Sequence, residues 1–246
     1  MDFTLLLILA TFASGLFLLL MKIGNENIKS FELINFTASL FPILFFVLVI
    51  RSFIVEPYRI PSGSMIPTLL VGDFILVKKY EYGIKLPLTN YTLIENEDPK
   101  YGDVIVFKYP QDKNINYIKR VIALPGDSIK YVNKEVFVNG EKYTQTLIED
   151  NYIFKNELHN HILFNETNSI KRYKIAKNPD PGQNFTYVVP KDTYFVLGDN
   201  RDNSNDSRYW GPVPKQNLIG RAFMIWMYWN SNSSYSAFDR IGLPID

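Results

Sequence analysis

The segment Pro61-Ser62-Gly63-Ser64-Met65-Ile66-Pro67-Thr68 divides the chain into two parts of different character. Two long uncharged apolar runs precede it, and a region with the pattern of short strands follows it. Prolines fix the backbone on both sides and withhold their amides, while Gly63 allows a backbone shape that other residues resist. The segment therefore predicts a rigid turn that presents Ser64 to a cleft. A polar linker leaving a membrane helix is the alternative, because loops rich in Ser, Gly and Pro are common.

Composition narrows the class of protein. The chain has 246 residues, a formal net charge of +1 and 47% hydrophobic residues. A near-neutral balance gives no basis for nucleic-acid binding, which needs clustered Lys and Arg. The chain has no cysteine, which excludes disulfides, thiolate metal sites and a cysteine nucleophile. The high apolar content instead indicates membrane spans.

The first apolar run, Phe3 to Met21, is 19 residues long and lies between Asp2 and Lys22. A helix that crosses a bilayer needs about 20 apolar residues. A cleaved targeting signal is the rival, but it should open with positive charge and end at small residues spaced A-x-A. Here the opening charge is acidic and no such site follows, so the run predicts a membrane anchor.

The second apolar run, Leu33 to Ile50, is 18 residues long and contains Pro42. We expect Pro42 to kink this helix, which membrane helices tolerate. The predicted anchor, residues 1–55, comprises two spans and a connecting loop, at about 3–21, 33–52 and 22–32. The loop and the outer flank each carry two cations, so the positive-inside comparison does not give the orientation.

The remaining residues, 56–246, are enough for one soluble domain with the pattern of a β protein. Short apolar or β-branched runs end at Gly, Pro or Asp turns, at 74–77, 103–109, 117–124, 135–138, 142–144, 193–197 and 218–229. Asn139-Gly140 between two of these runs is a strong hairpin signal. No convincing amphipathic helix appears, so we predict a mainly antiparallel β domain. Residues 145–189, rich in Asn, Lys and Glu, predict an inserted smaller β region or long loops.

Histidine is the usual base that activates a serine nucleophile, because serine is weak until its proton is taken. The only two histidines, His159 and His161, lie in the polar insertion without an apolar setting. A His-x-His pair could also bind metal, but no third ligand lies at a recognisable spacing. We therefore expect neither a histidine base nor a metal.

Lys119 is the remaining candidate base. A free lysine has a pKa of about 10.4 and is charged at neutral pH, but burial favours the neutral form and lowers the pKa. Lys119 lies in Tyr117-Ile118-Lys119-Arg120-Val121-Ile122-Ala123, among apolar strand residues. The alternative is a lysine on an edge strand, placed there to discourage aggregation.

A third polar cluster runs from Gly198 to Arg208, with the sequence Gly-Asp-Asn-Arg-Asp-Asn-Ser-Asn-Asp-Ser-Arg. A calcium loop starting at Asp202 would need Gly at 207 and Glu at 213, where the chain has Ser207 and Val213. Calcium is therefore rejected. A solvated turn and a buried network, in which Asp–Arg pairs fix one hydroxyl, both remain open.

These segments together resemble bacterial type I signal peptidase, also called leader peptidase. Five motifs follow the order of that family, namely the segments 61–68, 102–107 (Gly-Asp-Val-Ile-Val-Phe), 117–121 (Tyr-Ile-Lys-Arg-Val), 124–127 (Leu-Pro-Gly-Asp) and 198–208. The two leading spans match the form with two membrane helices, and the resemblance covers nearly the whole chain. The insertion at 145–189 departs from the longest members, since it looks short and lacks the cysteine pair that some of them carry there.

The resemblance implies a role for each matching residue. Ser64 would be the nucleophile and Lys119 the general base, as a Ser–Lys dyad. Ser62 and the Ser64 amide would form the oxyanion hole, and Ser204 would hydrogen-bond and orient Lys119. Asp206 and Arg208 would form a structural pair that supports the site. Small pockets for substrate side chains would be lined by Ile60, Pro61, Met65, Leu69, Ile75, Val106, Tyr117 and Ile118.

The implied protein is a membrane-bound serine endopeptidase that removes signal peptides from exported preproteins after a small-x-small site, without metal or cofactor. It would be a multi-pass protein of the bacterial inner membrane, in contact with lipid and near the export translocon. Its catalytic domain would lie on the extracytoplasmic face. Two alternatives stay open: a self-cleaving or other membrane-tethered peptidase with the same dyad, and a non-enzymatic anchored β domain that binds partners.

Overall fold

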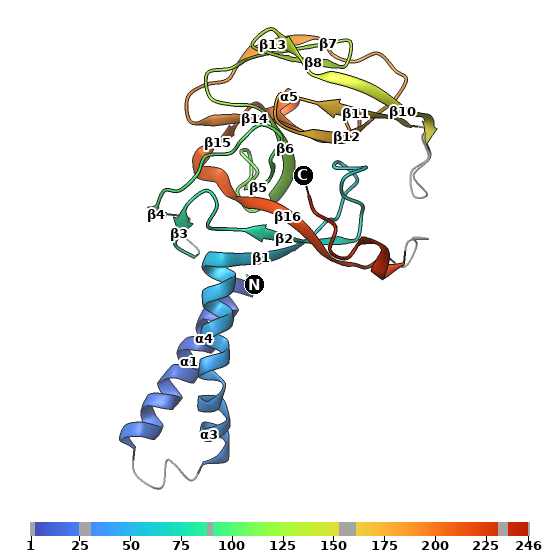
Figure 1. Ribbon diagram of the computed structural model, residues 1–246. Helices are drawn as coiled ribbons and strands as arrows, with labels where there is room; N and C mark the ends of the chain where they lie inside the picture. The colour runs from blue at the N-terminus through green and yellow to red at the C-terminus, as the bar shows by residue number, and fades with distance from the viewer. Residues whose placement is uncertain (1–2, 25–30, 88–90, 153–160, 231–235, 246) are drawn as a thin grey trace.

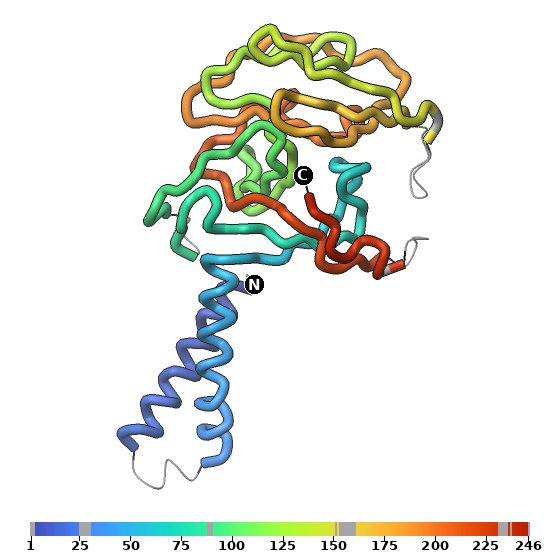
Figure 2. Tube along the Cα trace, in the orientation of Figure 1, coloured from blue at the N-terminus to red at the C-terminus, as the bar shows by residue number. Residues whose placement is uncertain are grey.

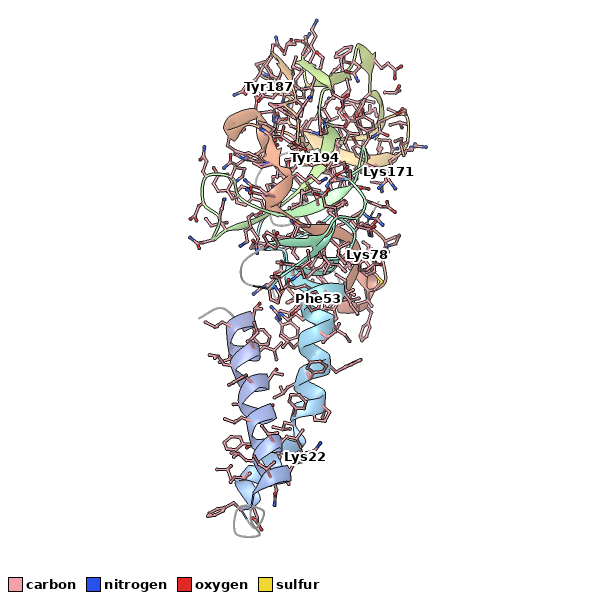
Figure 3. The ribbon with its side chains drawn as sticks, turned by 90° about the vertical axis from the view of Figure 1, so that its left-hand side faces the viewer. Lys22, Phe53, Lys78, Lys171, Tyr187 and Tyr194 are labelled. Carbon is pink, nitrogen blue, oxygen red and sulfur yellow. The ribbon has the colours of Figure 1, made fainter. Side chains whose placement is uncertain are left out.

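A pair of helices at one end of the molecule carries a β domain at the other (Figure 1). The computed structural model describes residues 3–24, 31–87, 91–152, 161–230 and 236–245. Lys22 lies at the far end of the helix pair, and Phe53 lies where the second helix joins the β domain (Figure 3). Much of the predicted 22–32 loop and part of the predicted insertion, including His159, lie outside the described residues.

The two apolar runs form helices long enough to cross a bilayer. They cover Phe3–Ile23 and Glu32–Ile54, each slightly longer than predicted. The first is α1, and the second comprises α3 (Glu32–Ser39), α4 (Phe41–Val49) and the π-helical turn η1 (Ile50–Ile54). The second helix divides at Leu40, just before Pro42 in the first turn of α4. Proline is tolerated at that position, where its missing amide has no helical partner.

Small side chains let α1 pack closely against the second helix. The side chains of Thr11, Ser14 and Ala38 are buried between them. At Gly15 a Cβ atom would lie 2.9 Å from the ring of Phe41, so a larger residue would push the helices apart. Close backbone approach through small residues is the usual means of association between membrane helices.

The β domain is built on a seven-stranded sheet of order β1-β2-β16-β5-β6-β14-β15, in which every neighbouring pair is antiparallel. Its strands are β1 (Val55–Arg59), β2 (Asp73–Lys78), β16 (Leu218–Tyr228), β5 (Val104–Lys108), β6 (Asn116–Ala123), β14 (Thr193–Leu197) and β15 (Val213–Pro214). Alternate side chains of β2 are buried, as in a strand with one face on the core. The predicted strands in this sheet are therefore present, with bounds shifted by a residue or two.

Three smaller sheets complete the domain. They consist of β13 (Phe185–Val188), β7 (Ser128–Val132), β8 (Glu135–Val138) and β9 (Glu141–Lys142); of β10 (Thr144–Tyr152), β11 (His161–Thr167) and β12 (Arg172–Lys177); and of β3 (Ile84–Lys85) and β4 (Thr92–Ile94). Asn139 and Gly140 both have positive φ, at 52° and 85°, as a two-residue hairpin turn requires. The short helix α5 (Ser207–Trp210) and the 3-10 turns η2 (Lys215–Asn217) and η3 (Ala237–Arg240) are the only other helical pieces of the described β domain.

The fold class predicted from the sequence is confirmed: two N-terminal apolar helices precede a mainly antiparallel β domain with a smaller inserted β region. Strands β10, β11 and β12 form their own sheet above the main one (Figure 1). The domain boundaries, 1–55 for the anchor and 56–246 for the β domain, remain a proposal. β1 was not predicted, because Pro57 argues against a strand except at a sheet edge, and β1 is an edge strand.

Candidate active site

Ser64 lies in a loop, residues 60–72, that joins β1 to β2 and rises from the main sheet toward β11 and β12 (Figure 2). Two backbone hydrogen bonds close its base, from the Ile60 amide to the Asp73 carbonyl (2.8 Å) and from the Gly72 amide to the Ile60 carbonyl (3.0 Å). Met65 is completely buried in the sheet core and holds the loop in place. The predicted rigid turn is therefore a short loop with its own apolar anchor.

Lys119 lies on β6 opposite Ile105 of β5, inside the sheet rather than at its edge. Its side chain is buried, and its Nζ lies 2.7 Å from the Oγ of Ser64 and 2.9 Å from the carbonyl oxygen of Ile118. The structure therefore brings together the predicted nucleophile and the predicted base, which are 55 residues apart in sequence. This placement excludes the edge-strand alternative for Lys119.

Burial lowers the pKa of Lys119 to about 8, against the attraction of the Asp206 and Asp199 carboxylates, which acts in the opposite direction. Each of these carboxylates forms an ion pair with an arginine. Arg208 binds Asp206 through two hydrogen bonds of 2.8 Å, and Arg120 binds Asp199 at 2.8 and 2.7 Å. Because the acids are paired in this way, desolvation remains the dominant effect on the lysine.

The loop that follows β14 is hydrogen-bonded to the backbone of the serine loop. The backbone amide of Asn200 donates to the carbonyl of Ser64, and its side-chain amide donates to the carbonyl of Gly63, both at 3.1 Å. Gly198 allows the close approach, since a Cβ atom there would lie 2.4 Å from the Ser64 carbonyl oxygen. The polar cluster at 198–208 is thus a buried network, and the solvated-turn alternative is wrong.

Two further arginine pairs were not predicted residue by residue. Arg120 and Asp199 are completely buried, and Thr68 of the serine loop donates its hydroxyl to the same Asp199 carboxylate. Arg201 and Glu166 of β11 form a second fully buried bidentate pair. The sequence signal was present only for Asp199 and Arg201, which lie within the polar cluster, because nothing local shows which distant partner each will meet.

Ser204 departs from the expected arrangement. Its side chain is buried, but its Oγ has no hydrogen-bond partner among the residues that the structure describes. The hydrogen bond to Lys119 implied by the resemblance is therefore not formed here. The described hydrogen bonds of Lys119 go to Ser64 and to the Ile118 carbonyl instead. Ser204 nevertheless borders the serine loop, since a Cβ atom at Gly198 would touch both Ser204 Oγ and the Ser64 carbonyl.

Ser62, the predicted oxyanion donor, lies on the same turn as Ser64 and is exposed. The predicted pocket residues divide into two groups. Ile60, Met65, Leu69, Ile75 and Val106 are buried in one core cluster, against which the half-buried Ile118 packs. Tyr117 belongs to the neighbouring cluster and stacks on Tyr109, and Pro61 is exposed. In this form of the protein, only the half-buried and exposed members present surface to a substrate.

Metal is not indicated in the described part of the chain, where no group of three or more His, Cys, Asp or Glu side chains is arranged to hold an ion. The structure corrects one expectation about the histidines. His161 has no exposed surface at the start of β11, whereas its sequence context indicated a polar setting.

Comparison with known proteins identifies the family. A family model described as signal peptidase, peptidase S26, matches residues 33–229, which is most of the chain. The chain belongs to this signal peptidase family. A signal peptidase I of Pseudomonas fluorescens is 48% identical over 230 residues, 86% of this chain and 79% of that protein. One from Pseudomonas aeruginosa is 45% identical over 226 residues, with the same coverage of both chains.

A solved signal peptidase I from Enterococcus faecalis is also similar, at 28% identity over 51% of this chain and 97% of that one, with a TM-score of 0.34. The family match and the Pseudomonas relatives show the enzyme class. The chain is a serine peptidase of the signal peptidase I type, a family that removes signal peptides from exported preproteins. Its two N-terminal apolar helices are suited to membrane anchoring.

Proposed function

We propose that this signal peptidase uses Ser64 as nucleophile and Lys119 as general base to cleave exported preproteins after a small-x-small site. One observation carries the assignment: the buried Lys119 Nζ lies 2.7 Å from Ser64 Oγ. A general base must lie within about 2.6–3.2 Å of the proton that it takes. A pKa lowered to about 8 leaves a useful neutral fraction of the lysine near neutral pH.

In the proposed reaction, neutral Lys119 takes the Ser64 proton as Ser64 Oγ attacks the scissile carbonyl carbon. The exposed Ser62 hydroxyl and the Ser64 amide stabilise the oxyanion, and such a donor is worth about 3–4 kcal/mol in other peptidases. The lysinium then protonates the leaving amine, so that the mature protein departs and the signal peptide stays as an ester on Ser64. Water activated by the same lysine hydrolyses the ester.

Supporting residues hold this geometry in the proposal. Asp206 and Arg208 fix the turn before α5, where the Asp206 carboxylate also accepts a hydrogen bond from the Gly198 amide at 3.0 Å. Ser204, buried beside the serine loop, packs next to the Ser64 carbonyl and supports the backbone there. Ile118 and Tyr117, with Ile60, Pro61, Met65, Leu69, Ile75 and Val106 behind or beside them, shape shallow pockets that admit small side chains.

The proposed location is a bacterial inner membrane, with the β domain on the extracytoplasmic face and near the export translocon. The support is the direct join of the second span to β1, which leads within a few residues to the serine loop. A secretory signal keeps its apolar segment in the bilayer and its cleavage site just outside. Enzyme and substrate would then meet at the same depth.

Cleavage of a purified preprotein by the detergent-solubilised protein tests the assignment, with the new N-terminus of the product sequenced. We expect the parent to cut after a small-x-small site, and Ser64→Ala and Lys119→Ala each to lose activity. Lys130→Ala, an exposed lysine on β7, is the matched control and should cut normally. Retained cleavage by Lys119→Ala would assign the base elsewhere. A folded parent that cuts no preprotein would favour the binding-domain alternative.

A further inference from the structure

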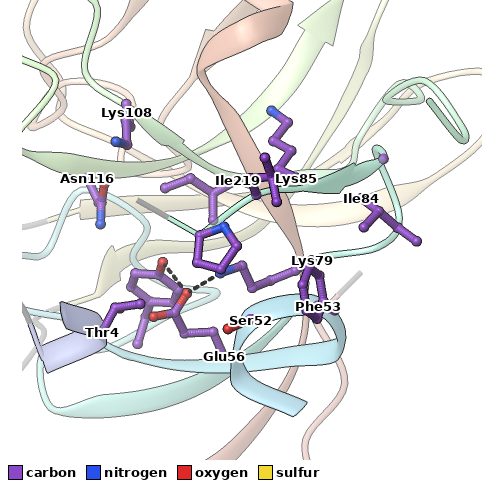
Figure 4. Close-up of a pocket in the computed structure, with 14 residues that line it drawn as sticks. Thr4, Ser52, Phe53, Glu56, Lys79, Ile84, Lys85, Lys108, Asn116 and Ile219 are labelled. Atoms are coloured by element: carbon purple, nitrogen blue, oxygen red, sulfur yellow. Dashed lines mark hydrogen bonds and ion pairs between the residues drawn. The ribbon is translucent and has the colours of Figure 1, made fainter. Parts of the chain in front are cut away.

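A cavity of about 160 Å³ lies at the join of the helix pair and the β domain, and neither Ser64 nor Lys119 lines it (Figure 4). Its wall includes Ser52 and Phe53 from the end of the second span, and Thr4 from the start of α1. Phe53 marks the level at which the helices meet the sheet (Figure 3). If the spans cross a bilayer, the cavity therefore lies at the depth of the lipid headgroups.

The wall of this cavity has an excess of positive charge. Lys79, Lys85 and Lys108 face a single carboxylate, that of Glu56. Glu56 is already satisfied, because it binds Lys79 at 3.1 Å, Arg51 at 3.0 Å and the Tyr58 hydroxyl at 3.0 Å. The ammonium groups of Lys85 and Lys108 thus remain without a carboxylate among the described residues.

Lys85 shows the effect of this imbalance. Its Nζ donates to the backbone carbonyls of Leu218 and Gln216, and burial together with Lys108 and Lys215 lowers its pKa to about 8. Lys215 is itself neutralised by Glu95 and Asp98 in a neighbouring hollow. The repulsion that an anion could relieve is therefore concentrated between Lys85 and Lys108.

Ser52 independently points to a polar ligand at this cavity. It lines the cavity and is 4% exposed, yet its hydroxyl oxygen has no hydrogen-bond partner in the described part of the chain. A buried hydroxyl without a partner is energetically unfavourable in proteins, so such groups call for an explanation. Phe53 and Ile219 add apolar wall beside these polar groups, as an amphipathic ligand requires.

We propose that this cavity binds the phosphate of an anionic phospholipid headgroup at the membrane surface. Lys85 and Lys108 supply the charge, Ser52 donates a hydrogen bond, and Phe53 and Ile219 contact the start of the acyl chains. Ammonium groups at this depth attract anionic lipids in general, and the cavity adds a defined place for one of them. The bound lipid would link the end of the second apolar helix to β3 and β5, and so stabilise the position of the β domain on the helices.

The test is the melting temperature of the full chain in an uncharged detergent, titrated with phosphatidylglycerol, phosphatidylcholine or inorganic phosphate. A ligand that binds only the folded protein raises the melting temperature with concentration. We expect phosphatidylglycerol to do so well before the other two. The double variant Lys85→Gln/Lys108→Gln should need at least about tenfold more phosphatidylglycerol for the same rise in melting temperature, because it loses two charge-assisted hydrogen bonds.

The matched control is Lys130→Gln/Lys174→Gln, which removes the same charge from exposed positions on β7 and β12 and should respond like the parent. Ser52→Ala and Lys108→Gln alone keep the test available if the double variant does not fold. An equal shift with phosphatidylcholine would overturn the proposal, as would an unchanged response of all the cavity variants. If inorganic phosphate raised the melting temperature as much as phosphatidylglycerol does, the cavity would bind a free anion and the lipid proposal would be wrong.

Discussion

At the residue scale, Lys119 depends on a balance between burial, which favours its neutral form, and two nearby carboxylates, which favour its charged form. Burial prevails because Asp206 and Asp199 are each held by an arginine in a bidentate pair. A lysine base on this chain is thus a product of the whole polar network around it. The same network keeps Ser64 in reach, through the hydrogen bonds of Asn200 to the serine loop.

The pH profile of cleavage follows from this balance. The pKa of Lys119 is lowered from 10.5 to about 8, and only the neutral amine accepts a proton. We therefore expect kcat/KM for a preprotein to rise with pH through about 8 and then to level off. The measurement is kcat/KM between about pH 6 and 10, over which a normal lysine would stay charged. Lys130→Gln should leave the profile unchanged, and a profile without a basic group titrating in this range would count against the lysine base.

Gly198 gives a second outcome at this scale. In Gly198→Ala the new methyl group would lie 2.4 Å from the Ser64 carbonyl and 2.2 Å from Ser204 Oγ, so the serine loop must move. Displacing a reacting group by about 1 Å can cost roughly 100-fold in rate. We expect kcat to fall by about that factor while the protein still folds. Gly126→Ala is the control, since a Cβ atom there meets no atom within 4 Å, although its φ of 90° adds some strain. An unchanged kcat in Gly198→Ala would contradict this prediction, because it would show that the serine loop can accommodate the methyl group without displacing Ser64.

At the element scale, strand β11 supports the site from the inserted sheet. Glu166 of β11 forms a completely buried pair with Arg201, which directly follows Asn200. Tyr173 of β12 and Gln145 of β10 donate hydrogen bonds to the same carboxylate, at 2.9 and 2.7 Å. The inserted sheet is therefore connected by this buried pair to the loop that holds the serine.

Breaking that pair should be costly. In Glu166→Gln, Arg201 becomes a buried cation without a counter-charge, a change that destabilises other proteins by about 3–5 kcal/mol. We expect a large fall in melting temperature together with reduced cleavage. Glu141→Gln on β9, where the side chain is exposed, should change the melting temperature little. Equal effects of the two variants would mean that the inserted sheet does not support the site.

At the scale of the whole molecule, Glu56 connects the apolar helices to the sheet. Its carboxylate binds Arg51 at the end of the second span and Lys79 just after β2. Arg51 also lies 4.3 Å from the ring centre of Phe3, at the start of α1. These contacts set the orientation of the β domain relative to both helices.

Loss of this connection should affect membrane substrates selectively. For Glu56→Ala we expect cleavage of a preprotein in lipid vesicles to fall several-fold, because domain and bilayer lose their fixed orientation, while a short soluble peptide is cut at the parental rate. The ratio of the two rates is the measurement. Glu97→Ala is the control, because the exposed Glu97 forms a salt bridge with Lys100 at the protein surface. A ratio equal to that of the parent would show that orientation does not depend on Glu56.

The whole molecule also shows what could be predicted from sequence. Hydropathy and length predicted both long apolar helices, and Gly, Pro and Asp turn signals predicted most strands of the main sheet. Asn139-Gly140 predicted the hairpin of β8 and β9 in one of the smaller sheets. These features depend on local residues. The Lys119 environment was predicted from its apolar neighbours on β6. By contrast, no local pattern shows that Arg201 pairs with Glu166, because the two residues lie far apart in the sequence. The burial of His161 and the unpartnered hydroxyl of Ser204 could not be predicted from their sequence neighbours either.

The most direct test of the proposed chemistry is to identify the residue that carries the acyl group. A preprotein reaction is quenched within a turnover, and the mass of the intact protein and of its digested peptides is measured. The proposed reaction predicts a signal peptide esterified to Ser64 in the parent, and none in Lys119→Ala, since without the base the serine does not attack. An acyl group on any other residue, or turnover of preprotein by Ser64→Ala, would contradict it.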